Sequence, residues 1–522
     1  MAIISKDVLL TIAFMFLTYT LVYGGRDRSS FLLQNHLNQL FLKQFGNCNN
    51  ISSSRVCFDQ ISNPAKFWRW SRESLATALR AEHYYNKDTL LAGGVNSSAP
   101  LFRQLTVPQE EIGFLNDHNN RLVGSALLRQ IRVSPARRRL AASYSTLLSE
   151  DHQAYGVGWR AADDSRSSAA RTEYRHTSVN ELSGYLLTRG VVDTYSAGGY
   201  TLLLSQSRNA MDGRFKKLER EGWIDRHTRA IAVEFSIYNS QINLFAVSRM
   251  LVEMPPTGGF ITSFKIQPVR LLRHNNDGTL LVKYMFEGTF VLTLIFMVMK
   301  LIAALWSVDK PDRWAVGLDV TTVVVGALAA SAYILRHLEV REKLEEFNKS
   351  RGFAYINLNW ATMTDELFDY SMGAVMFLAT LKLIAIVRLT DKRISLMADT
   401  LKRASGQILS FSVVSVVVFA AFSLLFHHML GRKQRLFSSL LATAAQCFSL
   451  LLNRFDFQAV FASHRYMGSF AVAAYFLVVV IFVVGFFVTA LNAWLDVVRR
   501  DAQRGSADYQ LVAFGWNKAR LC

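Results

Sequence analysis

The sequence predicts an α-helical membrane protein in which six transmembrane helices, arranged as a voltage-sensor-like four-helix bundle plus a pore module, accompany a large α+β extracytosolic domain. Three observations predict this class. The 522 residues are 51% hydrophobic yet 19% charged, so the chain must separate two kinds of surface. Six nearly uncharged apolar runs each approach the ~20 residues that cross a bilayer as a helix. The long segment between the first two runs is instead polar and rich in turn residues.

The apolar runs set the order of elements along the chain. They comprise residues 8-23, 286-306, 314-336, 372-390, 407-430 and 469-495. No small-residue cleavage site follows the first run, so we interpret residues 1-23 as a retained signal anchor. Residues 24-285 contain alternating segments such as "RAIAVEFSIY", which indicate a folded α+β domain between the first and second helices. The remaining divisions are helices two to four over 286-390, a linker helix over 391-406, the pore module over 407-495 and a cytosolic tail over 496-522.

Glycosylation sequons and basic residues predict the orientation. An even number of spans places both chain ends on one side of the membrane. Asn50, Asn96 and Asn348 each begin an Asn-X-Ser sequon, and all three fall on the opposite side. Basic residues gather in the connections on the side of the ends, as the positive-inside rule expects of a cytosolic face: Lys310, Arg313, Lys392, Arg393, Lys402, Arg403, Arg499, Arg500 and Arg504.

Cysteine usage and charge limit the function classes. A disulfide between Cys48 and Cys57 would close a small loop of the outer domain and contribute ~2 to 3 kcal/mol, with two free buried thiols as the alternative. No Cys/His spacing predicts a metal site, and no nucleotide loop or nucleophile motif predicts an enzyme or a cofactor. Much of the net charge of +18 belongs to the outer domain, which argues against nucleic acid as a partner. We interpret it as a solvated basic face near membrane lipid or partner surfaces.

Charged residues inside the third and fourth spans indicate a voltage-sensor-like bundle. The fourth span contains Lys382 and Arg388, and the third contains Asp319. An acid in one helix can neutralise a base in its neighbour, which is the arrangement of a voltage sensor. The alternative is that Arg388 reaches the inner interface while Lys382 forms a static pair. Because the positive charges are sparse, we favour a weak or silent sensor.

The stretch between the fifth and sixth spans predicts a re-entrant pore helix. An apolar segment too short to cross leads into Leu452, Asn453, Arg454 and, two residues later, Asp456. Irregular backbone at membrane depth is tolerated where it lines a cavity, so we assign these four residues to the pore or filter. In the sixth span, we assign Gly485 as a packing or hinge position and Asn492 as an inner-gate or interhelical contact, because both interrupt an otherwise apolar helix.

Several ordered motifs resemble those of one known family. They are "FWRW" at 67-70, "LLRQIRV" at 127-133, "YSAGGY" at 195-200, "GWIDRHTRAIAVEFSIYN" at 222-239, "LVEMPPTGG" at 251-259 and "LDV" at 318-320. Together they resemble the polycystin family of transient receptor potential channels over nearly the whole chain. The resemblance implies that residues 24-285 form a polycystin domain, which in the family rings the pore and contacts neighbouring subunits.

Three features are more similar to polycystin-1-like than to polycystin-2-like sequences. They are "YGVGW" at 155-159, Ala385 between Lys382 and Arg388 in place of a second lysine, and Leu452-Asn453-Arg454 where polycystin-2-like channels read Leu-Gly-Asp. The chain therefore resembles the C-terminal six-span module of a polycystin-1-like protein. By that resemblance it is a fragment of a longer protein or a short form.

The resemblance implies a subunit of a heterotetrameric, non-selective or calcium-permeable cation channel, with polycystin-2-like subunits as partners and Ca²⁺ as a permeant ion. It implies a multi-pass protein of the plasma membrane or cilium, or of the endoplasmic reticulum. Four copies of Arg454 would repel cations, whereas one copy beside acidic partners would lower the negative charge of the filter. Alternatively, Arg454 pairs with Asp456 away from the axis. A non-conducting receptor or scaffold for adhesion, signalling or trafficking is the rival function.

Overall fold

The structure is a computed structural model. It describes residues 2-25, 27-43, 56-81, 113-137, 151-155, 172-182, 187-204, 208-272, 280-306, 313-350, 354-390, 392-452, 460 and 465-479, with the single positions 485, 488, 489, 492, 495 and 496. The chain divides into two compact units. One unit comprises Ala13–Ala379, and the other comprises Met1–Ile12 with Thr380–Cys522.

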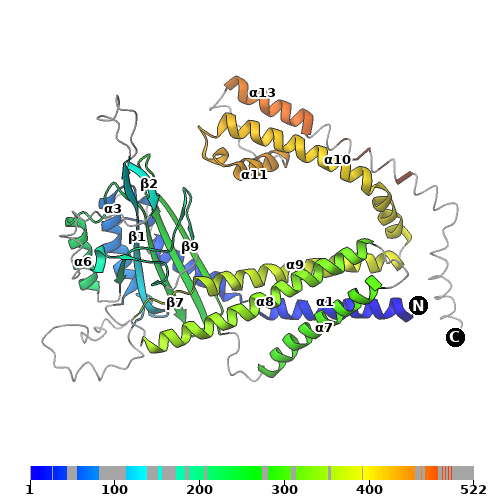
Figure 1. Ribbon diagram of the computed structural model, residues 1–522, viewed down its shortest axis with the longest axis horizontal. Coiled ribbons are helices and arrows are strands. Elements are labelled where there is room, and N and C mark those ends of the chain that lie inside the picture. The colour runs from blue at the N-terminus through cyan, green and yellow to red at the C-terminus, as the bar shows by residue number, and fades with distance from the viewer. Residues whose placement is uncertain are drawn as a thin grey trace. The chain divides into compact units, whose positions relative to one another are not determined.

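A seven-stranded antiparallel sheet forms the centre of the domain between the first and second predicted spans, which we call the outer domain after its predicted placement (Figure 1). The strand order is β3-β6-β1-β7-β8-β9, and β2 pairs with the end of β1. The strands are β1 Arg121–Arg137, β2 Asp151–Tyr155, β3 His176–Thr177, β6 Gly199–Leu204, β7 Thr228–Asn239, β8 Leu244–Glu253 and β9 Ile261–Val269, with a separate hairpin of β4 Thr188–Arg189 and β5 Thr194–Tyr195. The alternating segment "RAIAVEFSIY" lies within β7, which confirms the prediction of an α+β domain.

Short helices cover one face of this sheet. They are α2 Ser29–Asn38, η1 Gln39–Lys43, η2 Phe58–Gln60, α3 Pro64–Trp70, η3 Ser71–Leu75, α4 Ala76–Leu79 and α6 Arg208–Arg220, with η6 Thr172–Tyr174 beside β6. Asn63 caps α3 by accepting the Lys66 N–H at 2.8 Å, and Pro64 fits the first helical position. Trp68 lies within 6.1 Å of Trp223, ring centre to ring centre, and both are buried in this core.

The opposite face of the sheet carries smaller and more polar side chains. Along β7, Ile231, Val233 and Phe235 enter the helix-covered core, whereas Ala232 and Glu234 point the other way because side chains alternate along a strand. Gly124 in β1 has a φ of +74°, and a Cβ there would collide with the Ala354 carbonyl oxygen. This glycine therefore lets the 354-358 segment approach the sheet.

Helices from the first four predicted spans share one core. They are α1 Ala2–Gly25, α7 Leu280–Trp306, α8 Arg313–Lys349 and α9 Asn359–Thr390. Their buried contacts are Phe14 and Leu17 of α1, Phe290, Leu294 and Met297 of α7, Ala329 of α8, and Met372, Val375 and Ala379 of α9. Apolar side chains from these four helices therefore pack in one core, and the voltage-sensor-like character of the bundle stays a prediction.

Four described segments are long and apolar enough to cross a membrane: Leu9–Leu42, Tyr284–Ala303, Val316–Lys349 and Ile408–Leu430. They cover the first, second, third and fifth predicted spans. The fourth predicted span is helical within α9, but it does not reach the hydropathy of the others within the described residues. The sixth is described as α13 Arg465–Tyr475 and a few later positions. The predicted linker helix and fifth span form one helix, α10 Lys392–Leu430.

Candidate functional site

The end of α10, a short helix and α13 pack around one core in the predicted pore module. The short helix is α11 Leu440–Leu451, preceded by η7 Arg435–Phe437. Buried members of the core are Phe426, Leu430, Phe437, Cys447, Leu450, Val460, Ala471, Val472, Tyr475 and Val479. Figure 1 shows α11 beside α10. At ~1.5 Å per residue, the 12 residues of α11 are too short to cross a membrane, which agrees with a re-entrant pore helix.

Hydrogen bonds fix α11 at its start and along its length. Ser439 caps the first turn, since its hydroxyl accepts the Ala442 N–H at 3.2 Å. The Thr443 hydroxyl lies 3.1 Å from the Phe437 carbonyl oxygen. Near the other end, the buried Tyr475 hydroxyl donates to the Cys447 carbonyl oxygen at 2.8 Å. Helix α11 is therefore attached both to the turn before it and to α13.

The carboxyl end of α11 points its partial negative charge at the start of the predicted filter. Leu452, the residue after α11, is 56% exposed, and its N–H donates to the Phe448 carbonyl oxygen at 3.1 Å. Unpaired carbonyls at a helix end attract cations. Asn453, Arg454 and Asp456 lie outside the described residues, so their assignment to the filter stays a prediction.

Gly485 and Asn492, the two residues assigned in the sixth span, both lie at helical positions. A Cβ at Gly485 would meet no atom of the described residues within 4 Å, and the Gly485 carbonyl oxygen accepts a hydrogen bond from the Thr489 hydroxyl at 2.8 Å. Asn492 is exposed within its unit. Their roles as hinge and inner gate stay predictions.

The three residues assigned to a voltage-sensor-like function are distributed over two helices. Asp319 lies near the start of α8, and Lys382 and Arg388 lie near the end of α9. The Arg388 side chain is outside the described residues, and a pairing of Asp319 with either base stays a prediction.

A different charge pair joins α8 and α9. Arg336 Nη1 lies 2.9 Å from Asp365 Oδ1, and the same nitrogen lies 3.2 Å from the Arg270 carbonyl oxygen. This pair was not predicted, because Asp365 precedes the apolar run by which the fourth span was recognised. The signal that could have revealed the pair is Asp365 itself, an acid six residues after Asn359, where α9 begins.

The outer domain holds the segment between α8 and α9. The Ser125 N–H donates to the Ala354 carbonyl oxygen at 3.0 Å, and the Tyr355 hydroxyl donates to Glu234 Oε2 at 3.2 Å. Ile356 and Leu358 pack with Phe245 and Val247 of β8 in a further apolar cluster. The sheet is thus attached directly to the chain that enters α9.

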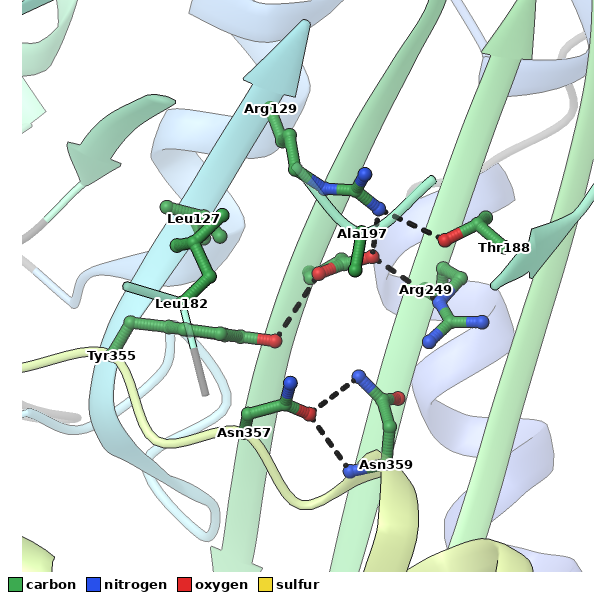
Figure 2. Close-up of a pocket in the computed structure, with 10 residues that line it drawn as sticks. Leu127, Arg129, Leu182, Thr188, Ala197, Arg249, Tyr355, Asn357 and Asn359 are labelled. Carbon is green, nitrogen blue, oxygen red and sulfur yellow. Dashed lines mark hydrogen bonds and ion pairs between the residues drawn. The ribbon is translucent and has the colours of Figure 1, made fainter. Parts of the chain in front are cut away.

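Glu234 is the centre of this attachment, and Figure 2 labels its partners Arg129, Arg249 and Tyr355. Its Oε1 accepts a hydrogen bond from Arg129 Nη2 at 2.9 Å and lies 3.3 Å from Arg249 Nε. Burial opposes ionisation of Glu234, but the two guanidinium groups outweigh it and hold the pKa of this carboxyl below its ordinary value. Burial, and then the Glu234 charge, raises the pKa of Tyr355. The phenol therefore stays protonated and the carboxylate charged.

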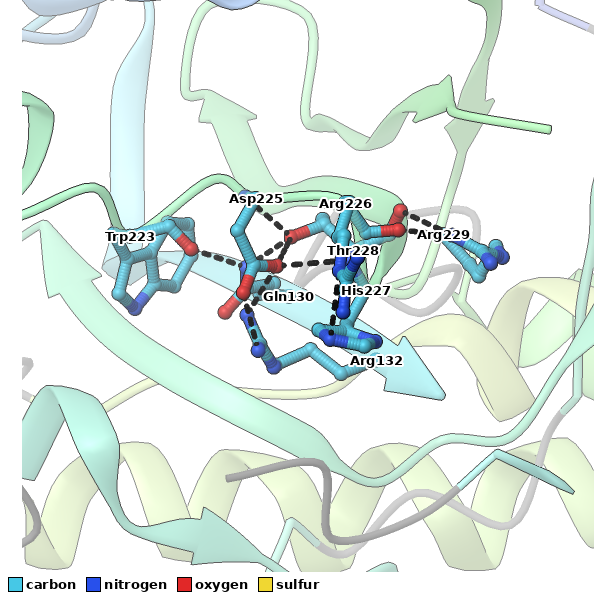
Figure 3. A network of polar contacts seen from close by, with 8 residues as sticks. All are labelled: Gln130, Arg132, Trp223, Asp225, Arg226, His227, Thr228 and Arg229. Carbon is cyan, nitrogen blue, oxygen red and sulfur yellow. Dashed lines mark hydrogen bonds and ion pairs between the residues drawn. The ribbon is translucent and has the colours of Figure 1, made fainter. Parts of the chain in front are cut away.

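A second polar network explains the motif at 222-239 (Figure 3). Asp225 accepts from both terminal nitrogens of Arg132, at 2.7 and 2.6 Å, and from the Thr228 N–H at 3.1 Å. The Gln130 side-chain nitrogen donates to the Trp223 carbonyl oxygen at 2.7 Å. Because these groups are largely buried and mutually bonded, we interpret the motif as structural.

The structure describes some of the residues of the predicted disulfide and glycosylation sites. Cys57 is buried and disulfide-bonded, but Cys48 lies outside the described residues, so the pairing of the two stays a prediction. Asn348 is exposed near the end of α8. Asn50 and Asn96 are outside the described residues. No metal-binding group of His, Cys, Asp and Glu occurs among the residues that the structure describes.

Comparison with known families matches both halves of the chain. A family described as "Polycystin domain" matches residues 57–272, and one described as "Polycystin cation channel" matches residues 274–498. The chain belongs to the polycystin cation channel family. The polycystin chain is accordingly a multi-pass membrane protein with a polycystin domain before its channel region, and it is not an enzyme.

Curated relatives come from both groups of polycystins. The chain is 27% identical over 97% of its length to Location of vulva defective 1 of Caenorhabditis elegans, and 26% identical over 99% to human Polycystin-2-like protein 1. It is also 21% identical over 94% to mouse Polycystin-1-like protein 3. These matches cover 16%, 61% and 21% of the relatives' own lengths. Because the chain is similar to both groups, overall identity does not distinguish a polycystin-1-like from a polycystin-2-like protein. The predicted pore residues must make that distinction.

Proposed function

We propose that this polycystin is a polycystin-1-like subunit of a heterotetrameric, calcium-permeable cation channel, in which it assembles with polycystin-2-like subunits and modifies selectivity and gating. The observation that carries the proposal is the sequence after α11. The pore helix ends at Leu451, and Asn453 and Arg454 follow within three residues. A base stands there in place of the acid of polycystin-2-like channels.

Electrostatics favours a mixed assembly over a homotetramer. Four guanidinium groups around one narrow axis would oppose cation entry, because like charges in a poorly hydrated pore repel strongly. One guanidinium among three acidic subunits leaves a net negative filter, with weaker attraction for a divalent ion. The expected result is a channel that conducts monovalent cations with reduced preference for Ca²⁺.

The test is whole-cell current from cells that express this chain, a polycystin-2-like partner, or both. We expect no current from this chain alone, and a mixed current whose Ca²⁺ permeability rises with Arg454→Asp. Arg341→Asp is the matched control, because it makes the same charge change at an exposed position of α8 whose side chain is 78% accessible. Surface expression of each variant is measured in parallel.

The rival function is a non-conducting scaffold for a polycystin-2-like channel. It predicts that both proteins co-purify and that Arg454→Asp leaves the mixed current unchanged in size and in Ca²⁺ permeability. That outcome would contradict the proposed role in the pore.

A further inference from the structure

A small polar cavity lies between the sheet of the polycystin domain and the start of α9 (Figure 2). Its volume is about 20 Å³, which is room for the centre of one water-sized or monatomic particle. The polar residues that line it are Arg129, Thr188, Glu234, Arg249, Tyr355, Asn357 and Asn359. They come from strands of the domain and from the segment that leads into the fourth helix.

Among the described residues around the cavity, the charges do not balance. Arg129 and Arg249 contribute two positive charges against the single negative charge of Glu234, and the side chains of Arg129 and Glu234 are 2% and 7% exposed. Tyr355 is neutral. In the next strand Lys265 pairs with Glu366 at 3.3 Å, so this neighbour adds no net charge. The amino end of α9 at Asn359 adds partial positive charge. This excess of positive charge favours an anion at the site.

Some hydrogen-bond donors at the cavity are available to bind an anion. Both terminal nitrogens of Arg129 are engaged, by Thr188, Glu234 and two carbonyl oxygens. Among the described residues, Arg249 contacts Glu234 through Nε, and its terminal nitrogens have no hydrogen-bond acceptor there. Asn357 Oδ1 accepts twice from Asn359, at 3.1 and 2.8 Å, and Figure 2 shows the Asn357 amide nitrogen directed away from Asn359.

We propose that this cavity is a binding site for one monatomic anion of chloride size, held by the terminal nitrogens of Arg249 and the amide of Asn357. A volume of about 20 Å³ suits a monatomic ion. The side chain of Arg249 is 22% exposed, which gives the anion access from solvent. Because Arg249 belongs to β8 and Asn357 precedes α9, a bound anion strengthens the attachment of the domain to the fourth helix.

The test uses the full chain in nanodiscs of uncharged lipid. Thermal unfolding is followed by tryptophan fluorescence while chloride replaces gluconate at constant ionic strength. A ligand that binds the folded state raises the midpoint in proportion to the logarithm of its concentration above saturation. We expect an upward shift that grows with the logarithm of the chloride concentration for the unmodified chain, loss of that shift in Arg249→Gln, and retention in Arg189→Gln, which removes an exposed arginine of β4 outside the cavity.

A second measurement tests the proposal on the unmodified chain, so it does not depend on whether the variants fold. The ³⁵Cl resonance broadens when chloride exchanges with a protein site, so excess line width of the unmodified chain should fall on titration with bromide. Asn357→Ala should lower the affinity several-fold without removing the charge. Equal midpoints in chloride and gluconate, with no excess line width, would show that the cavity holds water and overturn the proposal. A chloride shift that persists in Arg249→Gln would overturn it as well.

Discussion

Arg336 of α8 and Asp365 of α9 form an ion pair at 2.9 Å, with side chains only 3% and 12% exposed. Arg336 also donates to the Arg270 carbonyl oxygen, which follows β9 of the outer domain. One arginine therefore joins two helices of the bundle to the end of the sheet. This position ties the amino end of α9 to α8.

Removal of Arg336 should destabilise the protein strongly. Arg336→Leu leaves Asp365 charged and largely buried, and a broken buried pair typically costs ~3 to 5 kcal/mol. We expect a lower unfolding midpoint in nanodiscs, with a smaller loss in the double variant Arg336→Leu/Asp365→Leu. The control is Arg341→Leu on the exposed side of the same helix. Equal midpoints for Arg336→Leu and Arg341→Leu would contradict a stabilising pair.

The Tyr355 hydroxyl should contribute measurably to the attachment of the 354-358 segment. Tyr355→Phe keeps the ring but removes the donor to Glu234, and a hydrogen bond to a charged group is worth ~1.5 to 3 kcal/mol. We expect faster amide hydrogen exchange around residues 354-358 and a lower unfolding midpoint. Tyr370→Phe is the matched control, since Tyr370 of α9 is 73% exposed. Unchanged exchange in Tyr355→Phe would argue that backbone contacts alone hold the segment.

Glu234 should make the polycystin domain less stable in acid. Its pKa in the folded protein lies below the ordinary value of 4.5, so folding favours the charged form. The resulting stability is fully present above pH 4.5 and is lost as the pH falls through the lowered pKa. Unfolding midpoints from pH 6 down to ~3 should therefore decline more steeply in the unmodified chain than in Glu234→Gln. Parallel curves would show that other carboxyls cause the acid sensitivity.

The sequence predicted most of the membrane architecture because the hydrocarbon imposes a simple requirement. Apolar runs of sufficient length identify α1, α7, α8 and α10 directly. The fourth helix was recognised by residues 372-390, yet α9 begins at Asn359. Its first turns are polar and contact the outer domain, and hydropathy carries no signal for a helix that continues beyond the bilayer.

The contacts of Glu234 that attach the 354-358 segment to the sheet could not be predicted from hydropathy. Glu234 sits in an alternating strand pattern, but nothing in that pattern identifies Arg129, Arg249 and Tyr355 as its partners. Those contacts depend on strand register and on a segment more than a hundred positions later. Gly124 shows the same limit: its need for a positive φ follows from the approach of Ala354, which local sequence does not encode.

The Tyr475 hydroxyl should hold the carboxyl half of the pore helix in place. Tyr475→Phe preserves the packing against Phe426 but leaves the buried Cys447 carbonyl without this donor, at a cost of ~1 to 3 kcal/mol. The pore helix should then open more often and expose the Cys447 thiol, which is buried and free.

The readout is the rate at which a small thiol reagent modifies Cys447 in the folded protein, followed by mass spectrometry of its peptide. We expect that rate to rise about tenfold in Tyr475→Phe, because 1.4 kcal/mol corresponds to ~10-fold in an opening equilibrium. Ser449→Ala is the control, since it removes an exposed hydroxyl of the same helix that bonds within α11. If both variants react at the unmodified rate, the bond to Cys447 does not restrain the helix, and attachment through Ser439 and Thr443 at its amino end suffices.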